Sequence, residues 1–231
     1  MTEIKPHHGC LFIIEGIDGS GKTTFIDKLR YKMQNRPSIV LHFPRRDTDL
    51  GKYADEILTS NSMYDNENAN SVINIIDKLN AIDKITSYLE QGVDVYLDRF
   101  LLSQFVYSPI HNERYEKFVN YLPCEKELIF LMLREVINNY KFQFIFLKID
   151  PELALKRCES RSQTTEKFET LESLKLMRTR FDNLVRGLNA TSELPQGSTF
   201  NIKIFDVDNG SDKYVDDVVK DASAEYYKMS Y

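Results

Sequence analysis

The stretch that decides the fold is Cys10–Thr24, CLFIIEGIDGSGKTT. Its apolar segment, Leu11–Ile14, leads into the pattern Gly16-x-x-x-x-Gly21-Lys22-Thr23, and a helical apolar period follows. In such a loop the glycines let successive backbone N–H groups face one concavity, the lysine neutralises the β- and γ-phosphates, and the threonine ligates Mg²⁺. The stretch therefore predicts a nucleoside triphosphate site between a strand and a helix. The residues expected to bind the triphosphate are Gly16, Gly19, Ser20, Gly21, Lys22, Thr23 and Thr24.

The composition predicts one soluble globular domain over residues 1–231, since 42% of the residues are hydrophobic and 28% are charged. The net charge of −5 disfavours nucleic acid as a partner, because domains that bind nucleic acid are usually basic. Cys10, Cys124 and Cys158 are widely spaced, which argues against a disulfide framework and suits a reducing compartment. No apolar run reaches membrane length and no signal-peptide pattern opens the chain, so we expect no membrane partner and a cytoplasmic location.

Apolar segments that alternate with helical patterns predict the α/β class. Such alternation forms βαβ units, so we expect a P-loop NTPase with a five-stranded parallel sheet, helices on both faces and an arginine-bearing lid. The Asn-rich stretch 61–70 is expected to be a loop or a mobile segment, and about 109–140 an atypical helical insertion. The strands are expected at 11–14, 38–43, 93–98, 142–149 and 201–207, and the helices at 23–35, 75–89, 99–107, 151–161, 171–188 and 215–226.

Charged residues follow two of the predicted strands, at the sheet edge where parallel sheets bind ligands. Asp98 closes an apolar strand beside the phosphate loop, a position from which a carboxylate holds Mg²⁺ directly or through water. Arg99 is expected to reach the same phosphates. Arg46, after the second strand, has the planar guanidinium that grips an anionic acceptor with two hydrogen bonds.

Arg157 and Arg161 lie four residues apart on one face of a predicted helix, before a polar stretch. We expect them in a lid, about 157–168, that closes over the triphosphate, where an arginine is worth roughly 10³–10⁵ in rate. No NKxD-type guanine-recognition sequence follows the fourth strand, which disfavours a GTPase. The residues together predict phosphoryl transfer to an anionic acceptor. A phosphate acceptor is already ionised, so its reaction needs no dedicated base.

These residues resemble the thymidylate kinase family, within the P-loop nucleoside monophosphate kinases. The resemblance is carried by three segments, FIIEGIDGSGKTT at 12–24, Phe43-Pro44-x-Arg46-x-Thr48-x-x-Gly51, and Asp98-Arg99-Phe100-x-x-Ser103. It implies an enzyme that transfers the γ-phosphoryl group of ATP to dTMP, giving dTDP and ADP for dTTP synthesis. It also implies Mg²⁺ as cofactor, ATP and dTMP as small-molecule partners, and a homodimer.

The resemblance further implies a role for each matched residue. Asp18 would bond the 3′-hydroxyl of dTMP, and Arg46 would hold its phosphate. Ser103 would lie beside the base, and Tyr107 would exclude a ribose 2′-hydroxyl. The substrate-binding residues are then Asp18, Phe43, Arg46, Lys78, Arg99, Ser103 and Tyr107. The metal-binding residues are Thr23 and Asp98. The catalytic residues are Lys22, Arg99, Arg157 and Arg161, and Arg157 also binds ATP.

One position tells the branches of the family apart, and two further positions depart from the family pattern. Gly19 stands where one branch of the family has an arginine, so the resemblance is to the branch whose lid supplies the arginine. The family's base-reading arginine falls on Lys78, and its base-stacking phenylalanine falls on Asn74. Lysine keeps the charge but loses the planar fork, and asparagine has no ring. A broader-specificity deoxypyrimidine monophosphate kinase is therefore one alternative.

A second alternative is a deoxynucleoside kinase, which shares the phosphate loop and an arginine lid. It would need a carboxylate base for a neutral hydroxyl acceptor, and Glu15 or Asp18 could supply one. Arg46 would then have no acceptor phosphate to hold. A non-catalytic nucleotide-binding protein is disfavoured because Lys22 and Asp98 are both intact.

Overall fold

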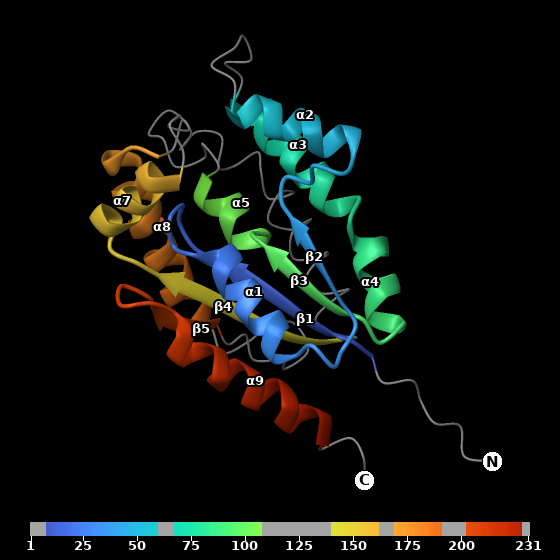
Figure 1. Ribbon diagram of the computed structural model, residues 1–231. Coiled ribbons are helices and arrows are strands. Elements are labelled where there is room, and N and C mark those ends of the chain that lie inside the picture. Colours follow the sequence, from blue (N-terminus) through green and yellow to red (C-terminus); the bar gives the residue numbers. More distant parts are fainter. Residues whose placement is uncertain (1–7, 60–66, 108–139, 162–168, 191–201, 228–231) are drawn as a thin grey trace, which may run out of the picture.

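The computed structural model describes residues 8–59, 67–107, 140–161, 169–190 and 202–227. One parallel sheet has the strand order β2-β3-β1-β4-β5, which puts β1, the strand before the phosphate loop, in the middle (Figure 1). The predicted α/β fold with a five-stranded parallel sheet is confirmed. The strands are β1 Cys10–Glu15, β2 Ser38–His42, β3 Asp94–Asp98, β4 Lys141–Lys148 and β5 Ile202–Asp206.

Helices cover both faces of the sheet. α1 and α9 lie side by side over the face turned to the viewer in Figure 1, and α8 lies behind the sheet. Within the described ranges, no helix combines the length and apolar character needed to cross a membrane. The described helices are α1 Lys22–Lys32, α2 Asp49–Thr59, α3 Glu67–Leu79, α4 Ile82–Glu90, α5 Leu101–Tyr107, α7 Pro151–Arg161, α8 Leu171–Ala190 and α9 Asp212–Tyr227.

The core lies along the central strand β1 and its neighbour β3, because helices cover both strands on both sides. Every residue of β1 and of β3 is buried. Aromatic rings fill the space next to these strands. Phe12 stacks on Tyr96 with ring centroids 4.7 Å apart, and Phe146 stacks on Phe181 at 5.1 Å. Burial of each such side chain stabilises the fold by about 1.5–3 kcal/mol, so the central sheet is a rigid base for the loops at its edge.

The prediction of a single helix over 75–89 is wrong, because the structure has two helices there, α3 and α4. The N–H of Ala81 donates to the carbonyl of Lys78 at 3.0 Å, which tightens the chain after α3, and α4 begins at Ile82. The loop predicted over 61–70 is wrong for residues 67–70, which form the first turn of α3. Packing of α3 against α2 outweighs the low helix propensity of asparagine. Residues 61–66 lie outside the described residues.

Helix α2 was not predicted, and it begins in the segment that carries Arg46. The Thr48 hydroxyl accepts the N–H of Gly51 at 3.1 Å, so it caps the helix. Gly51 has no room for a side chain, since a Cβ there would lie 1.8 Å from the Arg45 carbonyl oxygen. Both residues therefore serve the fold. Residues 109–139 and 162–168 lie outside the described residues, so the predicted insertion and most of the predicted lid stay predictions.

Candidate active site

The phosphate loop curls between β1 and α1, as predicted. Gly19 and Gly21 have φ of 75° and 85°, a region that favours glycine. A Cβ on Gly19 would lie 2.3 Å from the carbonyl oxygen of Ala154, so α7 packs directly on the loop. The buried hydroxyl of Ser20 has no hydrogen-bond partner within the described residues. A phosphate oxygen would supply the missing partner.

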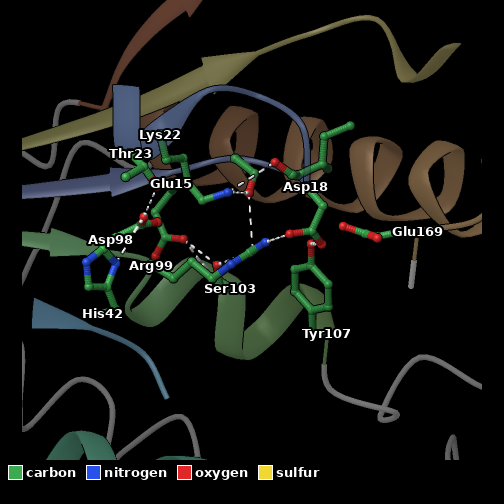
Figure 2. Close-up of polar contacts among 12 residues, drawn as sticks. Glu15, Asp18, Lys22, Thr23, His42, Asp98, Arg99, Ser103, Tyr107 and Glu169 are labelled. Carbon is green, nitrogen blue, oxygen red and sulfur yellow. Dashed lines mark hydrogen bonds and ion pairs between the residues drawn. The ribbon is translucent and has the colours of Figure 1, made fainter. Parts of the chain in front are cut away.

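Lys22 points back into the same loop (Figure 2). Its ammonium donates to the carbonyls of Gly16 at 3.2 Å and Ile17 at 3.1 Å. Burial, reinforced by the positive charge of Arg99, lowers the pKa of Lys22. In the described part of the chain no carboxylate lies within ion-pair distance of this amine. Its charge is thus free to neutralise a bound phosphate.

Thr23 and Asp98 meet at the end of β3, as the sequence predicted. The Thr23 hydroxyl donates to Asp98 Oδ2 at 3.0 Å. Burial alone would raise the pKa of Asp98, but the hydrogen bond with His42 and the charge of Lys22 lower it to about 2. An ionised carboxylate beside a hydroxyl is an oxygen donor set that suits Mg²⁺.

His42 is a neighbour of this pair that the sequence reasoning missed. Its Nδ1 lies 3.3 Å from Asp98 Oδ2, and the hydrogen bond with Asp98 raises the pKa of His42. One signal for it was available. His42 and Asp98 are the last residues of β2 and β3, and the two strands pair in register at that end. Arg46 lies close enough to His42 to lower the pKa of its imidazole, which places Arg46 at the same sheet edge.

Arg99 is the centre of the site in Figure 2. It has a φ of 67°, an uncommon conformation for a residue with a side chain. The guanidinium pairs with Asp18, donates to the Gly16 carbonyl at 3.2 Å, and lies 4.9 Å from the centre of the Tyr107 ring. The Tyr107 hydroxyl donates to Asp18 at 3.0 Å. Burial would raise the pKa of Asp18, but the charges of Arg99 and Lys22 lower it.

Glu15 holds the beginning of α5 in place. Its carboxylate accepts the backbone N–H groups of Phe100 at 3.0 Å, Leu102 at 2.9 Å and Ser103 at 3.2 Å, and also the Ser103 hydroxyl. Glu15 is fully buried, and burial raises the pKa of its carboxyl. Both oxygens are already occupied, so this residue is a helix cap that keeps Arg99 and Ser103 in position. The sequence reasoning considered it only as a possible base.

The side chains of the two arginines after β2 have different partners and different exposure. The Arg46 side chain is 72% exposed and pairs with Asp55 at 3.0 Å, so the structure does not bring it into contact with Arg99. Arg45 is buried instead, and its Nε donates to Asp77 at 2.9 Å. Arg45 thereby ties this segment to α3.

Lys78 and Phe43, both predicted to bind the acceptor, lie together. The Lys78 ammonium is 5.7 Å from the centre of the Phe43 ring, and Phe43 packs on Phe100 at 5.1 Å. Burial lowers the pKa of Lys78 to about 8. The ammonium donates to the side-chain oxygen of Gln104, another residue that the sequence reasoning missed.

The two predicted lid arginines have separate partners. Arg157 donates to the carbonyls of Val207 and Asp208, each at 3.3 Å, in the segment after β5. Arg161 pairs with Glu169 at 2.6 Å. The structure therefore does not bring the two guanidinium groups to one target, and their predicted roles in catalysis stay predictions.

Comparisons with known proteins agree with one another. The family model described as thymidylate kinase matches residues 14–194. A curated relative, thymidylate kinase of Leptospira borgpetersenii serovar Hardjo-bovis (strain L550), is 28% identical over 179 residues, covering 75% of this chain and 80% of the relative. The solved structure of thymidylate kinase from Candida albicans, whose title reports broad substrate specificity and a novel structural element, superposes with a TM-score of 0.70. It is 22% identical and covers 95% of this chain and 93% of that one, so it supports the fold.

Proposed function

Because this chain belongs to the thymidylate kinase family and transfers the γ-phosphoryl group of ATP to dTMP, we propose a role in that reaction for each residue of the site. The observation that carries the proposal is the position of Arg99. Its guanidinium contacts the phosphate loop through the Gly16 carbonyl and contacts α5 through Ser103. It therefore lies between the loop that binds the donor and the helix proposed to bind the acceptor.

The donor side consists of the phosphate loop and the residues packed against it. Backbone N–H groups of the loop would hold the β- and γ-phosphates, and Lys22 would turn from the carbonyls of Gly16 and Ile17 toward them. The Ser20 hydroxyl, which no described residue bonds, would donate to a phosphate oxygen. Arg157 on α7, which contacts the segment after β5, is proposed to support the nucleotide. Arg161 is proposed to add positive charge when the lid closes.

Mg²⁺ is the proposed cofactor, held through the Thr23 hydroxyl and Asp98. The oxygen donors present and the ionised state of Asp98 both fit this cation. When bound through these two side chains, it would supply positive charge that neutralises the charge developing on the transferring phosphoryl group.

The acceptor side is formed by residues from three segments. Asp18 is proposed to accept the 3′-hydroxyl, Phe43 and Lys78 to contact the base, and Arg46 to bind the phosphate after leaving Asp55. Ser103 and Tyr107 would border the sugar and base. Arg99 would then hold the two reacting phosphates in line. The acceptor phosphate is ionised near neutral pH, so positioning and charge neutralisation carry the reaction.

This arrangement disfavours the deoxynucleoside kinase alternative. A hydroxyl acceptor needs a carboxylate base with a free oxygen. Both oxygens of Glu15 accept hydrogen bonds from α5, and Asp18 is paired with Arg99 and Tyr107. Asp18 can still accept a hydrogen bond, but its lowered pKa makes it a weak base, and Glu15 is committed to α5.

We also propose a single catalytic domain that forms a homodimer in the cytoplasm. Val72 and Ile76 support self-association, since these apolar residues, four apart on α3, are 47% and 44% exposed. Cys158 is a free, buried cysteine, which suits a reducing compartment. Light scattering of the purified protein tests the dimer.

The experiment that tests the proposed function compares dTMP, dUMP, dCMP and thymidine as acceptors with ATP and Mg²⁺. We expect dTMP to be the best acceptor and thymidine to be inert. Turnover of thymidine without turnover of dTMP would contradict the proposal.

A further inference from the structure

A chain of three buried polar side chains crosses the proposed acceptor side. The exposed fractions are 9% for Ser71, 6% for Gln104 and 4% for Lys78. The amide nitrogen of Gln104 donates to Ser71 Oγ at 2.9 Å and to the Ser71 carbonyl at 3.2 Å, and its amide oxygen accepts from Lys78 Nζ at 3.1 Å. Gln104 on α5 therefore joins two residues that are seven apart, about two turns, on α3.

The chemistry of the partners determines how the Gln104 amide is turned. Lysine can only donate, so the amide oxygen must face Lys78 and the amide nitrogen must face Ser71. Ser71 offers two acceptors to this nitrogen. A reversed amide would place its N–H groups against the Lys78 ammonium and lose these bonds. The position of the Lys78 amine is thus set by a residue on a different helix.

The Lys78 ammonium keeps one donor for a ligand. It has three N–H groups, of which one goes to Gln104 and another to the Asn74 carbonyl at 3.3 Å. Within the described residues no third acceptor is bonded to it. The amine also lies against the Phe43 ring and close enough to Glu15 and Arg99 for their charges to act on it.

The same helix turn carries the phosphate-side contacts. Gln104 follows Ser103, whose N–H and hydroxyl are held by Glu15, and Ser103 contacts Arg99. Gln104 and Arg99 are therefore connected through one rigid turn. A base contact made through Lys78 is held at a set distance from the phosphate contact made by Arg99.

We propose that Gln104 determines base preference by orienting Lys78 so that its remaining N–H donates to the 4-carbonyl of a thymine or uracil nucleotide. Cytosine has an amino group at that position, so donor would meet donor. Gln104 is a positioning residue here, since it acts through Lys78. The inference rests on the proposed function, which places Lys78 at the base of dTMP.

The test is steady-state kinetics with dTMP, dUMP and dCMP for the wild type and Gln104→Leu, at saturating ATP and Mg²⁺. We expect Gln104→Leu to raise KM for dTMP and for dUMP together by about tenfold, with kcat changed less than about threefold. The preference for dTMP over dCMP in kcat/KM should fall by about tenfold.

Gln143→Leu is the matched control. Gln143 is an equally buried glutamine whose oxygen accepts from Lys203 at 3.0 Å, on β4 and away from the acceptor side. This variant should keep the wild-type preference. A merely structural role for Gln104 would lower kcat/KM for dTMP and dCMP by the same factor, and that result would overturn the inference.

A milder variant covers the case in which Gln104→Leu does not fold. Ser71→Ala removes one acceptor of the Gln104 amide and should lower the dTMP to dCMP preference about threefold. An unchanged preference in Ser71→Ala would then count against the inference. Failure of the proposed function is separately visible, because the wild type itself would not phosphorylate dTMP.

Discussion

Arg99 and Asp18 form an ion pair that connects the start of α5 to the phosphate loop. Asp18 also accepts the Tyr107 hydroxyl, so one carboxylate holds two of the residues proposed to border the acceptor. The pair keeps Asp18 ionised, because the charge of Arg99 lowers the pKa of Asp18 against the opposing effect of burial. An ionised Asp18 is the form that accepts a sugar hydroxyl.

Asp18→Asn should lower kcat/KM for dTMP by about 10–100-fold, since a hydrogen bond to a charged group is worth about 1.5–3 kcal/mol. The same measurement with a 3′-deoxy analogue of dTMP should show a much smaller loss. Asp182→Asn is the control, because Asp182 forms a comparable pair with Arg178 on α8. Equal losses with dTMP and the analogue would remove Asp18 from the 3′-hydroxyl.

Arg46→Ala should raise KM for dTMP by about 10–100-fold and leave KM for ATP within about twofold, because its guanidinium is proposed to bind only the acceptor phosphate. The readout is initial rate with each substrate varied in turn. Lys52→Ala, which removes an exposed positive charge from the adjacent α2, is the control. A similar rise in both KM values would exclude this assignment.

The arginine pair after β2 shows how far the sequence alone can be interpreted. The pattern located the segment at the sheet edge, and Arg46 lies there, near His42. It could not reveal that the neighbouring Arg45 is buried against Asp77, since that contact joins residues 32 positions apart. The strands and their alternation with helices were predictable, because buried parallel strands read as apolar runs.

Glu15 and Gln104 show the same limit within the site. Their roles depend on which backbone groups and side chains tertiary packing brings to them. Local pattern has no signal for such contacts. The phosphate loop, by contrast, was readable because one short segment holds the whole pattern, including Lys22 and the two carbonyls that its ammonium contacts.

Asp98→Asn should raise the Mg²⁺ concentration for half-maximal activity by about tenfold or more, because it removes an ionised oxygen ligand. Titration of activity with Mg²⁺ at saturating ATP checks this. Asp94→Asn, at the other end of β3, is the contrast. Asp94 pairs with Arg36 and accepts the Cys10 N–H, so its loss should lower the free energy of unfolding by about 1–3 kcal/mol without changing the Mg²⁺ requirement. An unchanged requirement in Asp98→Asn would contradict the metal assignment.

Lys78 should make stability depend on pH above about 8. Burial lowers its pKa from the ordinary 10.5 to about 8, so between these values the unfolded chain binds a proton that the folded chain does not. The free energy of unfolding should therefore gain about 1–2 kcal/mol from this group between about pH 8 and 9.5. Urea unfolding of wild type and Lys78→Met checks it. The wild type minus variant difference should rise with pH, and a constant difference would contradict the shifted pKa.

The most direct test of the central claim follows the γ-phosphoryl group itself. The protein is incubated with Mg²⁺, dTMP and ATP that carries a radioactive γ-phosphate, and the labelled products are separated. We expect the label at the β-phosphate of dTDP, in an amount equal to the ADP formed. Two results would contradict the account. One is label in inorganic phosphate alone. The other is no labelled product from dTMP together with labelled dTMP when thymidine is the acceptor instead.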